Sequence, residues 1–491
     1  MRRGAALWSA GAFSALLYLL FYYVPISDAH TREVIAWRPL GVWSIGSPVG
    51  LAIYYAAILA ALFGLYAFAF RRGAVTGDSA GARRAVYAGA AVFAVILVFT
   101  PSLLSKEVFG DIGQGRVLAA HRANPYMTPA SAFPEDEILK AMRGSELRTP
   151  HGPCWVSACG LLSSIAPGSI PASVIVFKIL FLAVHLTNGV IIGALLRGWG
   201  RAALPGEILY LWNPLVLLQT IGEAHNGAFL IFWVLLGLLF LQRRRAGSFS
   251  DEAFGVICLS VSALVKLVTA PILLFALGVL SRERRGSARW IRLSALAGVA
   301  AATFVLGYLP YASGIDLRGV LRPYLHGPYE GSALMILEMA LSKVLPAGEG
   351  GSPGAMLAPA MSAAAALLAI AVVVMALWLT SRALLLEDLP GFSLRVLLFY
   401  LLAATPSLRI SHGVWIVALA PLAIGPARRA ALLMSGSLFA LEIYWVWAIR
   451  MMGIAVPLHL PRAIASAVAL GVPALYLLAV FVRRRAAARA D

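Results

Sequence analysis

Residues 253–281 read AFGVICLSVSALVKLVTAPILLFALGVLS and lie between two arginine clusters, 243–245 and 282–285. Lys and Arg concentrate in the cytoplasmic loops of membrane proteins, so both ends of this stretch are predicted to face the cytoplasm. A helix needs roughly 20 residues to cross the bilayer, and the stretch is short for two full crossings. It is therefore predicted to form two short helices that turn near Pro271. If it is instead a single span, every later segment changes sides.

Apolar runs recur along the whole chain. Of the 491 residues, 60% are hydrophobic and 13% are charged, and the mean hydropathy is +0.84. A soluble domain carries about 25% charged residues, so this composition excludes one. We predict an all-α protein with a single transmembrane domain over residues 1–491 and about 14 spans (12–14). Besides the hairpin, the predicted spans are 5–27, 48–70, 85–104, 170–196, 204–221, 227–242, 290–312, 355–380, 391–405, 413–427, 430–449 and 463–482.

Two long polar segments face away from the cytoplasm if the amino terminus lies inside. They are residues 105–153 and 314–354, whereas the cytoplasmic loops are short. The apolar stretch 154–166 is too short to cross and is predicted to lie in the interface or to re-enter. These assignments predict a multi-pass protein of the cell membrane with its large loops on the extracytoplasmic face.

The net charge of +18 does not indicate nucleic-acid binding. The arginines cluster at helix ends, as at 71–72, 83–84 and 483–485, where they set the topology and contact anionic lipid headgroups. Membrane lipid is therefore the expected partner of this charge, and no nucleic acid is expected.

Two carboxylates begin the first outer segment, SKEVFGDIGQGR at 105–116. Glu107 and Asp111 share a face if the segment is helical, and Arg116 follows further along. A carboxylate at the membrane surface can act as a general base on an acceptor hydroxyl. Solvated acids are also common at helix ends, so the residue pattern alone gives the two interpretations equal weight.

A polar turn between two apolar spans is predicted to lie on the same outer face. It is TIGEAHNGAF at 220–229, which contains Glu223, His225 and Asn226. A turn needs only Gly or Asn, and charged groups near the bilayer are costly, so this composition favours a function over simple solvation.

The first outer segment also contains residues typical of a loop with a fixed shape. Asn124 and Tyr126 belong to an NPY triplet, and RTPHGPCW follows at 148–155. Rigid Pro-Gly turns favour scaffolding over direct chemistry for the prolines and the glycine. The pattern leaves the role of His151 open.

Isolated bases occur at three further positions. Arg409 and His412 lie in SLRISH at 407–412, and Arg409 could meet a phosphate. Lys266 lies inside the predicted hairpin, where it could equally extend to the interface as a structural residue. Signatures of soluble enzymes such as GxxxxGK[ST], HExxH and GxSxG do not occur in the sequence. An outward carboxylate with nearby bases suits a lipid-phosphate substrate.

In these segments the chain resembles the bacterial polyprenyl-phosphate-mannose-dependent mannosyltransferases of the GT-C superfamily. Residues 105–126 are similar to their S-D-D-V-Y-x-Y-x-x-x-G-R…NPY signature. HGP (151–153) resembles their YGP, EAHNGA (223–228) their E-x-H-N-D-A, and SHGVWIVALAPL (411–422) their HPWYLLWLLPL. Lys266 fits their V-K-x-x-x-x-P segment. The similar blocks follow one order over most of the chain.

Three departures from the family pattern are compatible with a different sugar or acceptor, or with a reduced role for the site. Lys106 and Glu107 stand where the family has two acids, and Gly227 replaces the acidic residue after Asn226. HGVW at 412–415 departs from HPWY.

The resemblance implies transfer of one sugar, mannose, from a polyprenyl-phosphate donor to an extracytoplasmic glycan or lipid acceptor, with inversion. Glu107 would be the catalytic base, with Asp111 as the fallback. A prenyl phosphate leaves without a metal, but a divalent metal at Glu107, Asp111 and Glu223 stays open. The residues implied to bind substrate are Arg116, Asn124, Tyr126, His151, Glu223, His225, Asn226, Lys266, Arg409 and His412.

Two other functions share this topology. A transporter or flippase for a lipid-linked sugar would need coupling acids deep in several spans, whereas the acids here are predicted to cluster at the outer face. A polymerase or ligase for cell-surface polysaccharide would use an oligosaccharide-pyrophosphate donor. The identity of the donor therefore separates the last function from the first.

Overall fold

The computed structural model describes residues 2–23, 47–102, 105, 107–141, 149–245, 248–314, 329–344, 357–451 and 459–490. Within these ranges the chain is helical and forms no strand beyond an isolated bridge between Glu330 and Ser407. Eight of the described helices are long and apolar enough to cross a membrane, and a bent pair brings the number to nine. The predicted all-α, polytopic fold is confirmed, and the count of about 14 spans stays a prediction.

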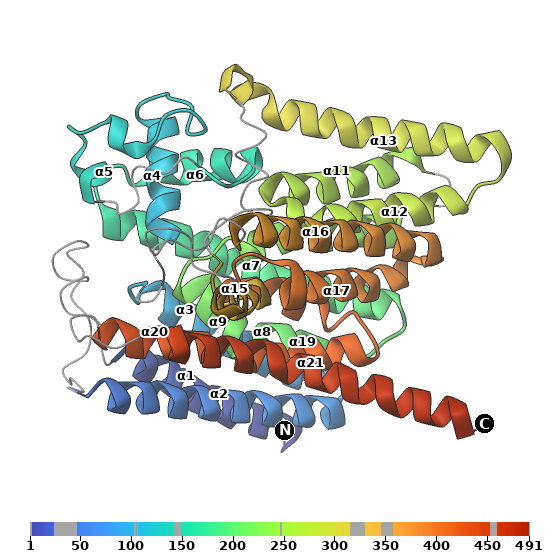
Figure 1. Ribbon diagram of the computed structural model, residues 1–491. Coiled ribbons are helices and arrows are strands. Elements are labelled where there is room, and N and C mark those ends of the chain that lie inside the picture. The colour runs from blue at the N-terminus through green and yellow to red at the C-terminus, as the bar shows by residue number, and fades with distance from the viewer. Residues whose placement is uncertain are drawn as a thin grey trace.

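The helices run roughly side by side in Figure 1, as expected for segments that cross one bilayer. At the bottom of that view lie α1 (Arg2–Tyr23), α2 (Pro48–Thr76) and α21 (His459–Ala490). At the top lie α13 (Gly286–Tyr308) and α16 (Leu357–Arg382), with α11 (Phe249–Val265) and α12 (Ala270–Arg282). The other long helices are α3 (Ala80–Val98), α7 (Ile170–Gly198), α10 (Gly227–Arg243), α15 (Ala333–Val344), α17 (Leu389–Phe399), α19 (Pro426–Ser437) and α20 (Phe439–Met451).

The stretch 253–281 forms two helices, as predicted. α11 ends at Val265, a short 3-10 turn spans Leu267–Thr269, and α12 then runs back beside α11 (Figure 1). The break lies at Lys266, a few residues before the expected turn, because Pro271 occupies the first turn of α12, where a missing N–H costs nothing. The hairpin tip therefore carries a lysine.

The predicted span 204–221 is wrong as a single helix. The chain forms α8 (Leu204–Leu211), a short α9 (Pro214–Leu217) and a π-helical turn at Leu218–Gly222, and α10 then departs at 113°. The break arises at Asn213 and Pro214, since proline cannot continue the hydrogen bonds of α8. The Asn213 side chain caps the new helix by accepting from the N–H groups of Leu215 and Val216.

A second correction concerns two of the later predicted spans, whereas 430–449 coincides closely with Pro426–Ala448, one of the eight membrane-capable helices. The segment 391–405 ends in a π-helical turn at Tyr400–Ala404, and 413–427 contains only the short α18 (Gly413–Leu419). Hydropathy measures apolar length and does not detect these local breaks.

The first outer segment is partly helical. It contains α4 (Glu107–Ala119) and the short α5 (Glu137–Ala141), and α6 (Pro153–Ile165) follows it; the three are grouped at the upper left in Figure 1. The prediction that 154–166 is too short to cross agrees with α6, which packs on α4. Residues 142–148 of this segment, and 315–328 and 345–354 of the second outer loop, lie outside the described residues.

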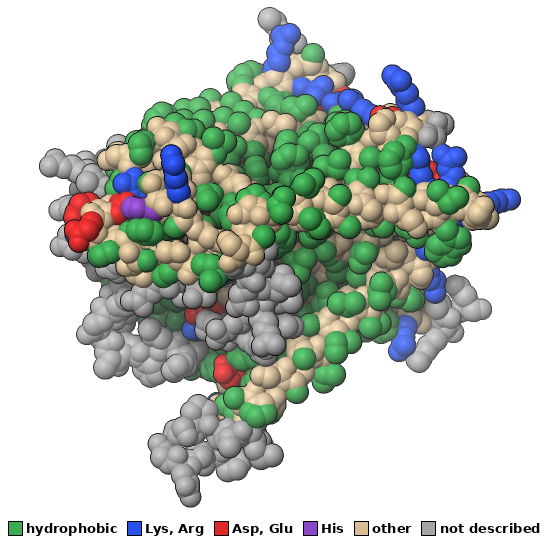
Figure 2. All heavy atoms as spheres, turned by 90° about the horizontal axis from the view of Figure 1, so that it is seen from above, with side chains coloured by type: hydrophobic (Ala, Val, Ile, Leu, Met, Phe, Trp, Pro, Cys, Tyr) green, Lys and Arg blue, Asp and Glu red, His purple; other side chains and the backbone are tan. Residues whose placement is uncertain are grey.

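The two ends of the molecule differ in charge. Figure 2 shows most of its visible Lys and Arg side chains toward the right end, whereas the left end, on the side of α4 and α5, shows Asp, Glu and His side chains together with a few Lys and Arg. α12 and α10 each carry an arginine in the last turn, Arg282 and Arg243. This asymmetry is typical of a membrane protein with its basic end in the cytoplasm.

A buried lysine connects the fold to the outer segment. Lys178 of α7 is fully buried, and its Nζ donates to the carbonyls of Leu97, at 3.2 Å, and Thr100, at 2.6 Å. The Leu97 carbonyl lies in the last turn of α3 and also accepts from the Thr100 hydroxyl at 2.8 Å, and Thr100 follows the end of the helix. The interaction fixes the chain just before Ser105 and α4, so Lys178 has a structural role.

Candidate active site

Three segments far apart in the sequence meet at Glu107. The residue begins α4, and its Oε2 accepts a hydrogen bond of 2.7 Å from Nδ1 of His225 in the turn before α10. Its Oε1 accepts a hydrogen bond from the guanidinium of Arg409, in the loop before α18. The structure thus brings together three of the residues that the sequence predicted for the site.

The turn that contains His225 also holds the backbone around Glu107, through Glu223. The Oε2 of Glu223 accepts from the N–H of Ser105 at 2.9 Å, and the hydroxyl of Ser105 accepts from the N–H of Glu107 at 3.2 Å. The predicted residue Glu223 therefore positions the start of α4. A buried carboxylate in this role keeps Glu107 aimed at the turn that contains His225.

The turn that carries His225 is unusual. Ala224 has a φ of 57°, a left-handed conformation that costs a residue with a side chain about 1–2 kcal/mol. The N–H of His225 donates to the carbonyl of Gln219 at 3.0 Å, across the end of the π-helical turn. This geometry turns the imidazole toward Glu107, and such strained residues concentrate at functional sites.

The loop that carries Arg409 is fixed by the segment at 329–332. Leu408 donates its N–H to the carbonyl of Glu330 at 2.7 Å, and Glu330 donates its own N–H to Pro406 at 3.1 Å. Gly331 has a φ of 65°, and a Cβ at this position would lie 2.6 Å from the carbonyl oxygen of Leu408. Only glycine fits this close approach.

The pKa of Glu107 reflects the charges around it. Burial alone would raise the pKa, but the charge and hydrogen bond of His225, with the charges of Arg409 and Lys266, hold it well below its ordinary value. Glu107 is therefore ionised at neutral pH.

Asp111 lies one turn further along α4 and behaves differently. Its side chain is buried, and its Oδ1 lies 3.4 Å from Nε2 of His151. Burial raises the pKa of Asp111 to about 7, with the charge of Glu107 adding to the rise. Burial lowers the pKa of His151 to about 3, so this imidazole is neutral. Two carboxylates with separated pKa values are typical of acid–base sites.

Lys266 lies beside this pair at the hairpin tip. Its Nζ is 5.8 Å from the ring centroid of Trp415, and the same ring stacks on His412 with centroids 4.5 Å apart. The His151 loop reaches the tip because Gly152 donates to the carbonyl of Val265 at 3.1 Å. A Cβ on Gly152 would lie 2.0 Å from the Leu264 oxygen.

A cavity of about 460 Å³ opens next to Glu107. Its walls include Glu223, His225 and Arg409, all predicted from the sequence. Its volume is within the about 300–1,000 Å³ usual for small-molecule sites. Sequence reasoning missed further lining residues, namely Gln219, Glu330, Glu442, Trp445 and Arg462.

Glu442 could have been found from its position. It lies within the predicted span 430–449, and an acid inside an apolar span is a functional candidate by itself. Glu330 and Arg462 had no such signal, because they become neighbours only in three dimensions, with a separation of 3.1 Å between Oε1 and Nη2.

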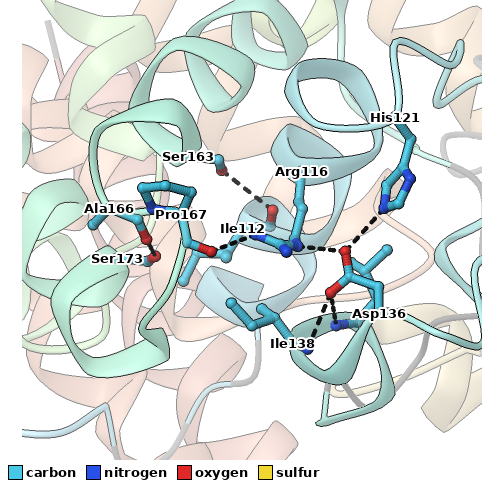
Figure 3. Close-up of polar contacts among 10 residues, drawn as sticks. Ile112, Arg116, His121, Asp136, Ile138, Ser163, Ala166, Pro167 and Ser173 are labelled. Carbon is cyan, nitrogen blue, oxygen red and sulfur yellow. Dashed lines mark hydrogen bonds and ion pairs between the residues drawn. The ribbon is translucent and has the colours of Figure 1, made fainter.

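The structure holds Arg116 in another place (Figure 3). Its Nε lies 2.5 Å from Oδ2 of Asp136, and its Nη1 donates to the Pro167 carbonyl. His121 donates to the same Asp136 oxygen at 2.9 Å. Arg116 thus ties α4 to the outer loop and is not among the residues that line the cavity. Its predicted role in substrate binding stays a prediction.

Asn124 and Tyr126 build the loop behind His151. The Asn124 Oδ1 accepts from the Tyr126 N–H at 3.0 Å, and the Tyr126 hydroxyl donates to the His151 carbonyl at 2.7 Å. Asn226 is buried, and its side chain has no hydrogen-bond partner within the described ranges. These three residues do not line the cavity, and their roles as substrate ligands stay predictions.

Comparison with known proteins identifies the family of this chain. The family model described as "Alpha-(1->6)-mannopyranosyltransferase, N-terminal domain" matches residues 8–282, more than half of the chain. The chain belongs to this family. It therefore belongs to the mannosyltransferases of the GT-C type that the sequence motifs resembled.

A curated relative supports the same family. The alpha-(1->6)-mannopyranosyltransferase A of Corynebacterium glutamicum is 24% identical over 207 residues, which are 40% of this chain and 38% of the relative. The chain thus matches well under half of that relative's length. No solved structure matches the chain.

The family match covers only part of the site. Residues 8–282 include Glu107, Asp111, His225 and Lys266, whereas Arg409 comes from the region that follows. Among the residues that the structure describes, no three His, Cys, Asp or Glu side chains are grouped as metal ligands would be. Glu107, Asp111 and Glu223 therefore do not form the donor set that the sequence left open for a divalent metal.

Proposed function

We propose that this protein is a membrane mannosyltransferase that moves one mannose from a polyprenyl-phosphate donor to an extracytoplasmic glycan or lipid acceptor, with inversion. The observation that carries the proposal is the placement of Glu107, held by His225 and Arg409 at the edge of the cavity. Membership of a mannosyltransferase family supports the sugar and the reaction type.

In the proposed reaction Glu107 is the base. The acceptor hydroxyl attacks the anomeric carbon, the bond to the phosphate oxygen breaks on the opposite side, and Glu107 takes the hydroxyl proton. The phosphate leaves as an anion. Because Glu107 is ionised at neutral pH, it is ready to accept the proton.

Arg409 is proposed to serve both the base and the leaving group. A guanidinium binds a phosphate as well as a carboxylate, and its side chain at this site is about half exposed. When Arg409 turns toward the donor phosphate, the Oε1 of Glu107 loses its partner and becomes more basic. Lys266, at the neighbouring hairpin tip, adds positive charge for the leaving group.

The extracytoplasmic location of the site rests on charge asymmetry. The site lies at the start of α4, on the side of α4 and α6, whereas α12 extends toward the other side of the molecule (Figure 1) and carries Arg282 in its last turn. The positive-inside rule then directs the cavity away from the cytoplasm.

A transfer assay with labelled polyprenyl-phosphate mannose in membrane fractions tests the proposal. The wild-type protein is expected to form mannosylated product, and Glu107→Gln is expected to lose it at equal expression. Glu137→Gln is the matched control, because this outer-loop acid is 83% exposed and pairs only with Lys140 among the described residues. Full transfer by Glu107→Gln would show that the assigned base is wrong.

The same material separates the competing functions. Movement of the labelled lipid across proteoliposomes without covalent product would indicate a transporter or flippase. Product only from an oligosaccharide-pyrophosphate donor would indicate a polymerase or ligase.

A further inference from the structure

The cavity extends from Glu107 to a second group of polar residues. Gln219 and Glu442 line it together with Trp445, and Glu330 and Arg462 pair at 3.1 Å on its wall. The cavity end that contains these residues has no role in the reaction proposed above.

Glu442 carries an unused acceptor into this end of the cavity. Its side chain is 3% exposed, and its Oε2 accepts from Nε2 of Gln219 at 2.9 Å. Its Oε1 has no hydrogen-bond partner among the described residues. Buried acceptors are normally satisfied, so an unpaired oxygen on a buried residue of the cavity wall indicates a ligand that donates a hydrogen bond.

The charges of the cavity disfavour a phosphate at this end. Arg462 is the guanidinium group at this end, and it is already bound to Glu330, whereas Gln219 and Glu442 bring no positive charge. A neutral ligand rich in hydroxyl groups would instead donate to Glu442 and meet no repulsion.

Trp445 provides an apolar surface beside these groups. Its side chain is 39% exposed and lines the cavity, and the Arg462 guanidinium lies 5.6 Å from its ring centroid. The C–H groups of a pyranose ring carry partial positive charge and pack well on the face of an aromatic ring. An aromatic ring that lines the same cavity end as a carboxyl oxygen without a partner suits a hexose.

We propose that Glu442, Gln219 and Trp445 form a hexose subsite that holds the terminal sugar of the acceptor, with a sugar hydroxyl donating to the Oε1 of Glu442. The inference rests on the proposed function, because Glu107 must receive the proton from that same acceptor. The carboxylate-rich end suits the acceptor sugar, whereas the donor phosphate needs the cations near Lys266 and Arg409.

Kinetics of the full chain in lipid nanodiscs test the subsite. Glu442→Met removes the open acceptor at similar volume and is expected to raise the acceptor KM about ten- to a hundredfold. Glu442→Gln is expected to raise it less, because Gln219 can turn its amide and one oxygen still faces the sugar. The donor KM is expected to change by no more than about twofold in both variants.

Trp445→Leu provides a second test, and Trp290→Leu is its matched control. Trp290 is 62% exposed on α13 and also lies under an arginine, with Arg289 at 5.2 Å from its ring centroid. Trp445→Leu is expected to raise the acceptor KM, and Trp290→Leu to leave it unchanged. A rise of the donor KM instead would assign the subsite to the donor sugar and overturn the proposal.

Direct binding separates this inference from the proposed function. Saturation-transfer NMR with methyl α-mannoside and a mannose disaccharide, without donor, is expected to show contacts in the wild type that Glu442→Met loses. If the wild type transfers mannose and Glu442→Met keeps both the wild-type acceptor KM and the sugar binding, the subsite is overturned and the proposed function is not. Sugar binding that depends on Glu442, in a protein without transferase activity, would support the hexose site and overturn the proposed function.

Discussion

His225 donates through Nδ1 to the Oε2 of Glu107 at 2.7 Å, although 118 positions separate the two residues in the sequence. The interaction orients the carboxylate and lowers its pKa, together with Arg409 and Lys266. It joins the first turn of α4 to the turn before α10.

His225→Ala is expected to reduce transfer about ten- to a hundredfold, the range for loss of a hydrogen bond to a charged group. It also removes a charge that lowers the pKa of Glu107, so burial raises that pKa again. A base works in its ionised form, and activity is therefore expected to fall off at a higher pH than in the wild type. Transfer rates between about pH 5 and 7.5 measure this shift.

The control for His225→Ala is His121→Ala. His121 also binds a carboxylate, at 2.9 Å from Asp136, but in the outer loop. Its variant is expected to keep the wild-type pH profile. An identical profile for both variants would show that His225 does not tune Glu107.

Asp111→Asn is expected to stabilise the protein more at pH 8 than at pH 5. Burial raises the pKa of Asp111 from 3.8 to about 7. Between these two pH values Asp111 is protonated in the folded state and ionised in the unfolded state. The contribution of Asp111 to the free energy of unfolding therefore decreases as the pH rises from about 4 to about 7, and it stays low at higher pH. Asparagine does not titrate and avoids the loss.

Melting temperatures in detergent at the two pH values measure this effect. Glu137→Gln, an exposed acid of the same outer segment, is expected to show no such difference. A melting-temperature gain of Asp111→Asn that is equal at both pH values would contradict the prediction.

Arg116→Ala is expected to destabilise the outer loop without changing the donor KM. Arg116 binds Asp136, whose side chain is 5% exposed, and removal of one partner from a buried interaction costs about 1–3 kcal/mol. A double-mutant cycle with Asp136→Ala, measured by melting temperature, should show that the two effects do not add. An increased donor KM would instead support the phosphate-binding role predicted from the sequence.

Gly115→Ala is expected to lower the melting temperature strongly. A Cβ on Gly115 would lie 2.2 Å from the Cys159 oxygen, so α4 and α6 would have to separate and Glu107 would move with α4. Gly110 lies in the same helix with nothing within 4 Å of its Cβ position. Gly110→Ala is therefore expected to be stable, with a gain of about 0.5–1 kcal/mol from helix propensity. Equal melting temperatures for the two variants would contradict this packing argument.

Sequence alone predicted the membrane-spanning, all-α fold and the break in 253–281. Both follow from local features of the sequence. The length of an apolar run indicates a membrane helix, and arginines at both ends of 253–281 indicate that the chain returns to the side from which it entered. Sequence also predicted that Glu107, His225 and Arg409 lie on one face, because each begins or ends an apolar segment on the same side. Their direct contact follows from the structure.

Tertiary structure alone decided which polar groups share the cavity. Arg116 follows Glu107 closely in sequence, yet it is bound by Asp136, whereas Glu442 and Arg462 enter the cavity from the end of the chain. Helical periodicity fixes the face on which a side chain lies but not the helix that faces it. That choice depends on packing between distant segments, as at Gly115 and Gly331, where only the absence of a side chain allows the close approach.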